Sequence, residues 1–353
     1  MKENGEKKIL VALSGGVDSA VTALKLKEDG YNCTGATLKL LENDTKTVSG
    51  GRQAAMDLSI PFVEVDGSKE FKEKVIDDFR EKYENGMTPS PCIQCNRYIK
   101  FSLLLKKAHE MGIPFMATGH YARVDYSVEY GRYLLKRAED PLKDQSYMLY
   151  LLTQDQLAHV LFPLGNMTKK EVRSIAEKNN LSSAGKKDSQ DICFVPNGDY
   201  VSFLENLKGE KYASGDFIDM DGNVLGKHKG IVNYTKGQRK GLGLSFPEPR
   251  YVVDINPLLN KVVLGKHEDL FSKEVIANRI NLIAYEKIEK PIRVTVKTRY
   301  SRRESPGTLI QEGPDRIKVI FDEPERAVTP GQALVIYDGD IVIGGGTIVG
   351  NRE

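Results

Sequence analysis

Two groups of residues in this sequence have types and spacings that suit chemistry. The first is a glycine turn, Ser14-Gly15-Gly16-Val17-Asp18-Ser19, between the apolar run 9–13 and a helical pattern that starts near Ala20. Glycines let backbone approach a ligand closely, and a helix N-terminus offers free N–H groups and the positive end of a dipole. The turn is therefore predicted to bind phosphate.

This turn differs from two common glycine-rich phosphate motifs. It lacks the Gly-Lys-Ser/Thr ending that places a lysine on the terminal phosphates, and it lacks the Gly-x-Gly-x-x-Gly spacing. A simpler interpretation is a strand-to-helix turn that needed small residues, with Asp18 and Ser19 capping the helix.

The second group is a set of three cysteines. Cys92 and Cys95 form a C-x-x-C in a polar, proline-containing loop, and Cys193 lies far along the chain. We expect Cys95 at the N-terminus of the next helix, which would lower its thiol pKa. Four cysteines in 353 residues cannot form a disulfide scaffold, so the close spacing indicates metal binding or catalysis. The fourth, Cys33, lies in an apolar strand and fits a small core residue.

The elements that must position these residues alternate between strands and helices in the first half of the chain. We expect strands at 9–13, 33–41, 61–65 and 113–117, and helices at 20–29, 51–58, 69–83 and 96–111. Such βαβ units form a doubly wound parallel sheet, and its ligands bind at the carboxyl ends of the strands. The turn at 14–19, Leu38 and Gly119 all fall at such ends. A hairpin at 121–137 and helices at 144–159 and 168–179 are expected next, the last with a capping box.

Beyond residue 212 the chain changes character. Short apolar runs alternate with Asp-Gly, Asn-Pro and Pro-Gly turn signals, a texture typical of small β domains. A chain of 353 residues also exceeds what one core usually organises. We therefore expect an α/β domain at 1–200, a β-rich central domain at 201–269 and a C-terminal β-barrel at 270–353.

Charge is nearly balanced overall, at +2, but two segments contain basic residues and no carboxylate. A single basic run is usually a solvated face, whereas two such runs favour an RNA contact surface. The first segment, 222–247, contains Lys227, Lys229, Lys236, Arg239 and Lys240; the second, 290–303, contains Lys290, Arg293, Lys297, Arg299, Arg302 and Arg303. No run of about 18 apolar residues occurs and the N-terminus is polar, so we expect a cytoplasmic protein.

The turn at 14–19 resembles the PP-loop of the ATP pyrophosphatase superfamily, whose members cleave ATP between the α and β phosphates and transfer AMP to an oxygen. Five further motifs, in order and over nearly the whole chain, resemble the tRNA-specific 2-thiouridylases, the MnmA family. These motifs lie at 118–122, 143–147, 188–194, 237–243 and 330–333.

The resemblance implies an enzyme, a tRNA-uridine 2-sulfurtransferase that acts on the wobble uridine. The C2 oxygen of the uracil is a poor leaving group. ATP, with Mg²⁺, would therefore adenylate this oxygen, and sulfur would then displace AMP. Cys193 would carry a persulfide, and Cys95 would release its sulfur or pair with Cys193 as a disulfide. The implied partners are tRNA and a sulfur donor, either sulfide or a sulfur-relay protein such as a cysteine desulfurase, with no membrane.

Matching positions to the family motifs gives two further sets of residues. The implied ATP-binding residues are Ala12, Leu13, Ser14, Gly15, Gly16, Val17, Asp18, Ser19, Leu38 and Gly119. The implied tRNA-binding residues are His120, Lys143, Asp144, Gln145, Arg299, Tyr300 and Gln332. For His120, a buried histidine bonded to backbone is the alternative. A wobble base would have to be flipped out to reach the cysteines and the α-phosphate together.

The sequence departs from the family pattern at Cys92, where an aspartate is usual, and at Ser90, where an asparagine is usual. The general-base role given to that aspartate is therefore in doubt. Cys92, Cys95 and Cys193 instead suit a 4Fe-4S cluster with one iron open to hydrosulfide, and zinc completed by His120 is a further alternative.

Two other functions would explain parts of the sequence pattern. One is another PP-loop AMP-forming ligase, and the other is a non-catalytic tRNA-binding sulfur carrier.

Overall fold

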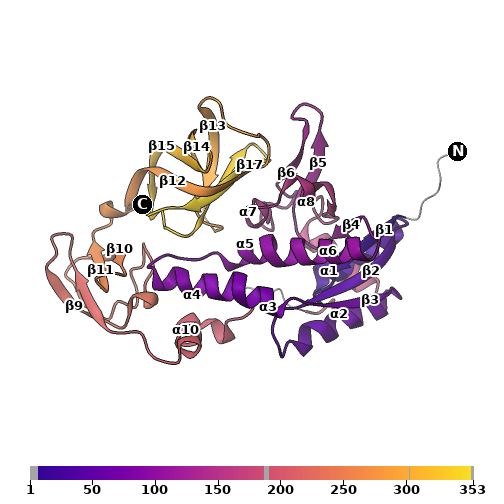
Figure 1. The fold of residues 1–353 in the computed structure, drawn as a ribbon, viewed down its shortest axis with the longest axis horizontal. Helices are drawn as coiled ribbons and strands as arrows, with labels where there is room; N and C mark the ends of the chain where they lie inside the picture. The colour runs from indigo at the N-terminus through magenta and orange to yellow at the C-terminus, as the bar shows by residue number, and fades with distance from the viewer. Residues whose placement is uncertain (1–6, 187–190, 302, 351–353) are drawn as a thin grey trace.

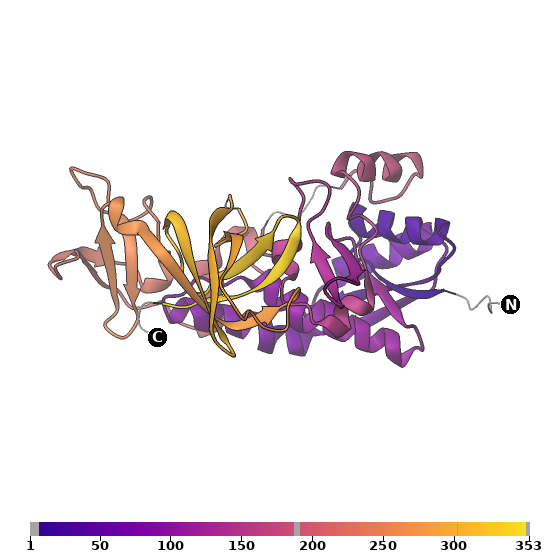
Figure 2. The ribbon, with the colours of Figure 1, turned by 90° about the horizontal axis from the view of Figure 1, so that it is seen from above.

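The computed structural model describes residues 7–186, 191–301 and 303–350. The parallel sheet lies at one end of the elongated molecule, a small four-stranded sheet at the other, and a β-barrel between them (Figures 1 and 2). The first three residues of the predicted motif at 188–194, up to Gln190, lie outside the described residues. Arg302 does so too.

The parallel sheet has the strand order β3-β2-β1-β4-β7, with every neighbouring pair parallel. Its strands are β1 (Lys8–Ala12), β2 (Asn32–Lys39), β3 (Phe62–Asp66), β4 (Phe115–Ala117) and β7 (Val160–Leu161). Side chains alternate across β1, so Ile9 and Val11 pack on one face and Leu10 on the other. Both faces are buried under helices, and the predicted doubly wound sheet is confirmed.

Two groups of helices cover these faces. Helices α1 (Val17–Glu28), α2 (Thr45–Asp57) and α9 (Lys169–Lys178) contribute to the core around Ile9 and Val11. Helix α6 (Phe101–Glu110) contributes to the core around Leu10, which continues toward the central domain. The capping box predicted at the start of α9 is present, because Thr168 and Glu171 each satisfy a backbone N–H of the other.

The cysteine segment differs from the sequence prediction. A helix begins at Pro91 rather than at residue 96, as α5 (Pro91–Cys95), which continues through a π-helical segment (Asn96–Lys100) into α6. Proline is favoured in a first helical turn because that turn needs no N–H there, which explains the early start. Cys92 and Cys95 are therefore helical residues, and neither lies in a polar loop.

A second continuous helical stretch runs beside it, consisting of α3 (Ser68–Phe71), a π-helical segment (Lys72–Ile76) and α4 (Asp77–Glu84). The helix predicted at 144–159 is instead broken into α7 (Ser146–Leu149) and α8 (Gln154–Ala158). The break follows from Thr153, which begins α8 with its own capping box.

The central domain contains α10 (Tyr200–Lys208) and a sheet with the order β10-β11-β8-β9. Its strands are β8 (Gly215–Ile218), β9 (Val224–His228), β10 (Tyr251–Asn256) and β11 (Lys261–Gly265). Most of the first basic segment lies in the long connection between β9 and β10, which has only a 3₁₀ turn at Ile231–Asn233.

The C-terminal domain is the predicted barrel. Its order is β12-β15-β14-β13-β16-β17, and it closes through an antiparallel pairing of β12 with β17. The strands are β12 (Phe271–Leu282), β13 (Ile292–Lys297), β14 (Ser305–Gly313), β15 (Arg316–Arg326), β16 (Ala333–Asp338) and β17 (Ile341–Ile348). The predicted hairpin, β5 (Arg123–Ser127) and β6 (Arg132–Lys136), joins the edge of β17. An element of the first domain thus extends the barrel sheet.

The barrel also holds the segment that precedes the cysteine helix. Thr88 donates its backbone N–H to the carbonyl of Pro330 at 2.9 Å, and Gln332 Nε2 donates to the carbonyls of Thr88 and Pro89, both at 3.0 Å. Gly331 between them has φ +85°, and a Cβ there would lie 2.9 Å from both Met87 Cβ and Thr88 O. Only glycine fits this contact without strain.

We expect Gly331→Ala to lower stability more than Gly339→Ala. Both glycines have a positive φ, which costs an alanine about 1 kcal/mol, but nothing lies within 4 Å of a Cβ at Gly339. The collision at Gly331 should add about 1–3 kcal/mol. The measurements, made on both variants, are the shift in the thermal unfolding midpoint and the rate of proteolysis between α4 and α5. Equal shifts and equal proteolysis would show that the barrel does not hold the 87–90 segment.

Candidate functional site

A cavity of about 480 Å³ opens at the carboxyl ends of β1, β2 and β4. The turn at 14–19, Leu38 and Gly119 converge there, as strand-end geometry predicts. Of the ten residues expected at an ATP site, nine line the cavity: Ala12, Leu13, Ser14, Gly16, Val17, Asp18, Ser19, Leu38 and Gly119. The tenth, Gly15, contributes a backbone conformation to the turn.

The turn leaves its helix amides available. Helix α1 has Gly16 as its N-cap residue, and no side chain caps it. Ser19 Oγ donates to Gly16 O at 3.0 Å and accepts from Ser14 N at 3.2 Å, which closes the turn on itself. The interpretation of Asp18 and Ser19 as capping residues is therefore wrong, and the uncapped first turn of α1 suits an anion.

Asp18 is held in one orientation by two residues from elsewhere in the chain. Lys169 Nζ lies 2.7 Å from each carboxylate oxygen, and the Tyr121 hydroxyl donates to Oδ1 at 2.9 Å. Tyr121 is 2% exposed, so its hydroxyl is a fixed part of the cavity wall. Sequence reasoning missed Lys169, although its place directly after the Thr168 cap marked it as the first residue of a helix.

Two more lysines reach the cavity, and neither was predicted. Lys186 Nζ donates to the carbonyl of Gly15 at 2.8 Å. Lys100, on the π-helical segment after Cys95, also lines the cavity. No motif in the sequence marks these two residues, because only the fold brings them to the strand ends.

Lys100 acts electrostatically on both the cavity and the thiols. The pKa of His120 is well below its usual value of 6.5, because burial disfavours the charged ring and the Lys100 ammonium adds to that effect. The same ammonium opposes the rise in the pKa of Cys95 and of Cys193. Lys100 is therefore within electrostatic reach of both the cavity and the cysteines, and it favours negative charge at each.

The cysteine environments differ from those expected. Cys95 is 6% exposed within the helix, and burial raises its thiol pKa above the usual value, although Lys100 lowers it. The prediction of a lowered pKa at a helix N-terminus is therefore wrong, because the helix begins one turn earlier. The side chain of Cys193 is exposed, yet the protein around it desolvates the thiolate and, with the thiols of Cys95 and Cys92, raises its pKa to about 11.

The three thiols are thus within electrostatic reach of one another, while Cys33 is a buried strand residue as predicted. In the part of the chain that the structure describes, no three His, Cys, Asp or Glu side chains are placed to hold a metal ion. Cys95 packs into the core while Cys92, one turn earlier, is exposed. The expected cluster ligands and the Cys-His zinc set are therefore not assembled in this conformation.

The residues expected at a tRNA site divide into two groups. His120, Lys143, Gln145 and Tyr300 line the cavity. Asp144, Arg299 and Gln332 instead bond within the protein: Arg299 donates to the carbonyls of Lys236, at 2.9 Å, and Ala327, at 3.2 Å, while Gln332 bonds the 87–90 segment. Burial also lowers the pKa of Lys236.

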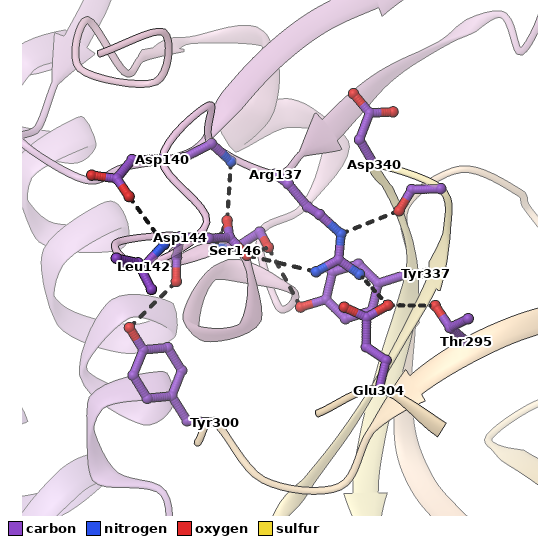
Figure 3. Close-up of polar contacts among 12 residues, drawn as sticks. Arg137, Asp140, Leu142, Asp144, Ser146, Thr295, Tyr300, Glu304, Tyr337 and Asp340 are labelled. Atoms are coloured by element: carbon purple, nitrogen blue, oxygen red, sulfur yellow. Dashed lines mark hydrogen bonds and ion pairs between the residues drawn. The ribbon is translucent and has the colours of Figure 1, made fainter. Parts of the chain in front are cut away.

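Asp144 is the centre of a network that connects the first domain to the barrel (Figure 3). Its carboxylate accepts from the backbone N–H groups of Ala138 and Ser146, both at 3.1 Å, and its carbonyl accepts from the Tyr300 hydroxyl at 3.3 Å. Nearby, Arg137 pairs with Glu304 at 2.8 Å and stacks on the Tyr337 ring at 3.7 Å. This network places Tyr300, a barrel residue, at the mouth of the cavity.

Comparison with known proteins gives consistent matches along the chain. Residues 7–197 match the family described as a tRNA methyl transferase HUP domain, 201–266 its PRC-barrel domain, and 272–348 an aminomethyltransferase beta-barrel domain. The tRNA-specific 2-thiouridylase MnmA of Clostridioides difficile is 47% identical, covering 97% of this chain and 98% of that protein. MnmA 1 of Caldanaerobacter subterraneus is 48% identical, covering 97% of each.

A solved 4-thiouridine synthetase–RNA complex with bound ATP is 19% identical, with a TM-score of 0.39 over 57% of this chain and 50% of that one, which is too distant to inform the site. None of the helices described is long and apolar enough to cross a membrane.

The neutral state of His120 predicts a pH dependence. Below about pH 6.5 the unfolded chain binds a proton at this position that the folded state does not, so stability falls as pH falls, by up to about 1.4 kcal/mol per pH unit. His120→Gln should reduce the loss of thermal stability between about pH 7.5 and about pH 5.5. The exposed His109→Gln is the matched control. His228 is also buried with a lowered pKa, so part of the dependence should remain.

Proposed function

Because this chain belongs to the tRNA-specific 2-thiouridylase family, we propose that its cavity carries out the two stages of uridine thiolation side by side. The chain is a tRNA sulfurtransferase, and it uses ATP. The observation that supports the proposal is that Lys100 lines the same cavity as the turn at 14–19 and also lowers the pKa of Cys95 and Cys193. The proposed substrate position is C2 of the wobble uridine.

In the first stage the C2 oxygen attacks the α-phosphorus of ATP, and pyrophosphate leaves. The uncapped amides of α1 would hold the departing phosphates, while Lys169 and Tyr121 keep Asp18 fixed beside them. Among the described residues that line the cavity, Asp18 is the only carboxylate and so the residue that fits a Mg²⁺ ion. When bound, Mg²⁺ would offset the charge of the pyrophosphate.

In the second stage sulfur replaces AMP. The terminal sulfur of a Cys193 persulfide attacks C2, the C2–O bond breaks, and AMP leaves. The Cys95 thiolate then attacks Cys193 Sγ, which forms a Cys95–Cys193 disulfide and leaves both electrons of the broken S–S bond on the sulfur at C2. Alternatively, Cys95 attacks the persulfide first and releases hydrosulfide. The disulfide is then reduced by an external thiol.

The difference in exposure between Cys193 and Cys95 supports these separate roles in sulfur transfer. Cys193 is exposed and can receive sulfur from a donor, whereas Cys95 is buried beside it and is shielded from donors and oxidants. The surrounding protein desolvates both thiols and raises the pKa of each, so Lys100 is proposed to stabilise the thiolate and persulfide anions during transfer.

A 4Fe-4S cluster on Cys92, Cys95 and Cys193 is the alternative sulfur carrier. The described residues do not bring these ligands together, which favours the persulfide as the carrier. Its chemistry would be to bind hydrosulfide at an open iron.

Cys95→Ser and Cys193→Ser should each abolish thiolation of unmodified tRNA while tRNA-dependent pyrophosphate release persists. The reason is that adenylation needs no thiol. The measurements are pyrophosphate release and thiolated nucleoside, with ATP, a sulfur donor and anaerobically purified protein; Cys33→Ser, which alters a buried strand cysteine, is the control. Loss of pyrophosphate release together with thiolation would contradict the two-stage division.

Cys92→Ser distinguishes the two sulfur carriers. With a persulfide on Cys193, the variant should still thiolate tRNA, because Cys92 takes no part in either bond exchange. Thiolation that depends on Cys92, in protein whose iron and acid-labile sulfide also depend on it, would establish the cluster instead.

For the tRNA contact, four basic residues of the first basic segment are exposed, Lys227, Lys229, Arg239 and Lys240, and the last two are adjacent in the sequence. Replacing each of these two by alanine should weaken tRNA binding and reduce the salt slope by about one unit per phosphate contact. Arg293→Ala is the control, because that exposed arginine already pairs with Asp322 through two contacts at 2.8 and 2.5 Å. The measurement is the tRNA dissociation constant as a function of salt; unchanged slopes for Arg239 and Lys240 would make the segment a solvated face.

A further inference from the structure

The side chain of Lys186 reaches the phosphate-binding turn from a distant part of the chain. Its Nζ donates to Gly15 O at 2.8 Å, across 171 positions of sequence. The backbone behind it is anchored, since Lys186 N donates to Ser183 O at 2.9 Å and Ser182 N donates to the Asp57 carboxylate at 2.9 Å. The contact is therefore built by the fold around it.

Glycines on α2 leave room for this contact. A Cβ on Gly50 would lie 3.3 Å from Gly15 Cα and 3.6 Å from Lys186 Nζ. A Cβ on Gly15, which has φ +72°, would lie 2.6 Å from the Gly50 carbonyl carbon. Three segments thus meet at the backbone of the turn, and the ammonium of Lys186 lies where they meet.

The charge of Lys186 is not matched by a contacting carboxylate. Its hydrogen bond goes to a neutral carbonyl, and among the described residues no Asp or Glu lies within ion-pair distance of its Nζ. The Lys186 ammonium lowers the pKa of Asp57 by less than the hydrogen bonds that this carboxylate accepts from Ser182 and Gln53. Lys169, by contrast, is already paired with both oxygens of Asp18.

We infer that Lys186 binds the β- and γ-phosphates of ATP, and so supplies the cation that the turn at 14–19 lacks in its own sequence. The ammonium bonds Gly15 O in the structure. When ATP binds, the flexible side chain moves to the phosphate oxygens that the turn holds, which are far stronger acceptors than a carbonyl. The inference rests on the proposed function, because it assigns the phosphate end of the same ATP site.

The experiment measures equilibrium binding of ATP and of AMP to the purified full chain without tRNA. Lys186→Met should weaken ATP binding about 10-fold to 100-fold, the loss of one or two charge-assisted hydrogen bonds, and leave AMP binding unchanged within about twofold. Lys186→Arg should recover part of the affinity. Lys178→Met, at the exposed end of α9 and outside the cavity lining, removes the same charge and should change neither.

Two results would overturn the inference: unchanged ATP affinity in Lys186→Met, or an equal loss of ATP and AMP, which would mean that Lys186 only shapes the turn. Both results can be distinguished from a failure of the proposed function. If only the proposed function failed, the wild-type chain would bind ATP with the Lys186 dependence described but would not thiolate tRNA.

Discussion

The structure depends on one close backbone contact, in which the turn after β1 meets the middle of α2 through Gly15 and Gly50. A side chain on Gly15 would collide with the backbone of Gly50, and one on Gly51 would lie 1.9 Å from Thr37 Oγ1. Because these glycines let α2 approach the strand ends, the turn is enclosed from one side while the first turn of α1 stays uncapped. An anion site needs both features: backbone donors in the open, and walls that reduce solvent around them.

The charges around the cavity follow from this enclosure. Asp18 could not remain beside a triphosphate without compensation, and Lys169 supplies it through both carboxylate oxygens. Lys100 and Lys186 then bring positive charge to the cavity lining, and Lys100 also acts electrostatically on the thiols while Lys186 bonds the turn. Phosphate and thiolate are both anions that burial disfavours, so the same positive charges would stabilise both halves of the proposed reaction.

Much of the fold could be predicted from the sequence because it follows local patterns. The parallel sheet, the strand-end position of Ser14–Ser19 and the Thr168 capping box all rest on periodicity and motifs a few residues long. The lysines could not be predicted, because Lys169 and Lys186 reach Asp18 and Gly15 only through the packing of distant elements. The pKa direction of Cys95 was wrong for a related reason: a helix that begins only one turn earlier moves a thiol from an N-terminus into the core.

The barrel contributes no cysteine but contacts the elements on both sides of the candidate site. Gln332 bonds the segment that leads into the cysteine helix, and Tyr300 reaches the cavity mouth from the same domain through its bond to Asp144. Arg299 joins the barrel to the central domain through the carbonyl of Lys236. A tRNA that engages these side chains must exchange bonds that hold the domains together for bonds to RNA. An exchange at Gln332 would release the 87–90 segment, so the proposed tRNA surface and the cysteine helix would be linked through this contact.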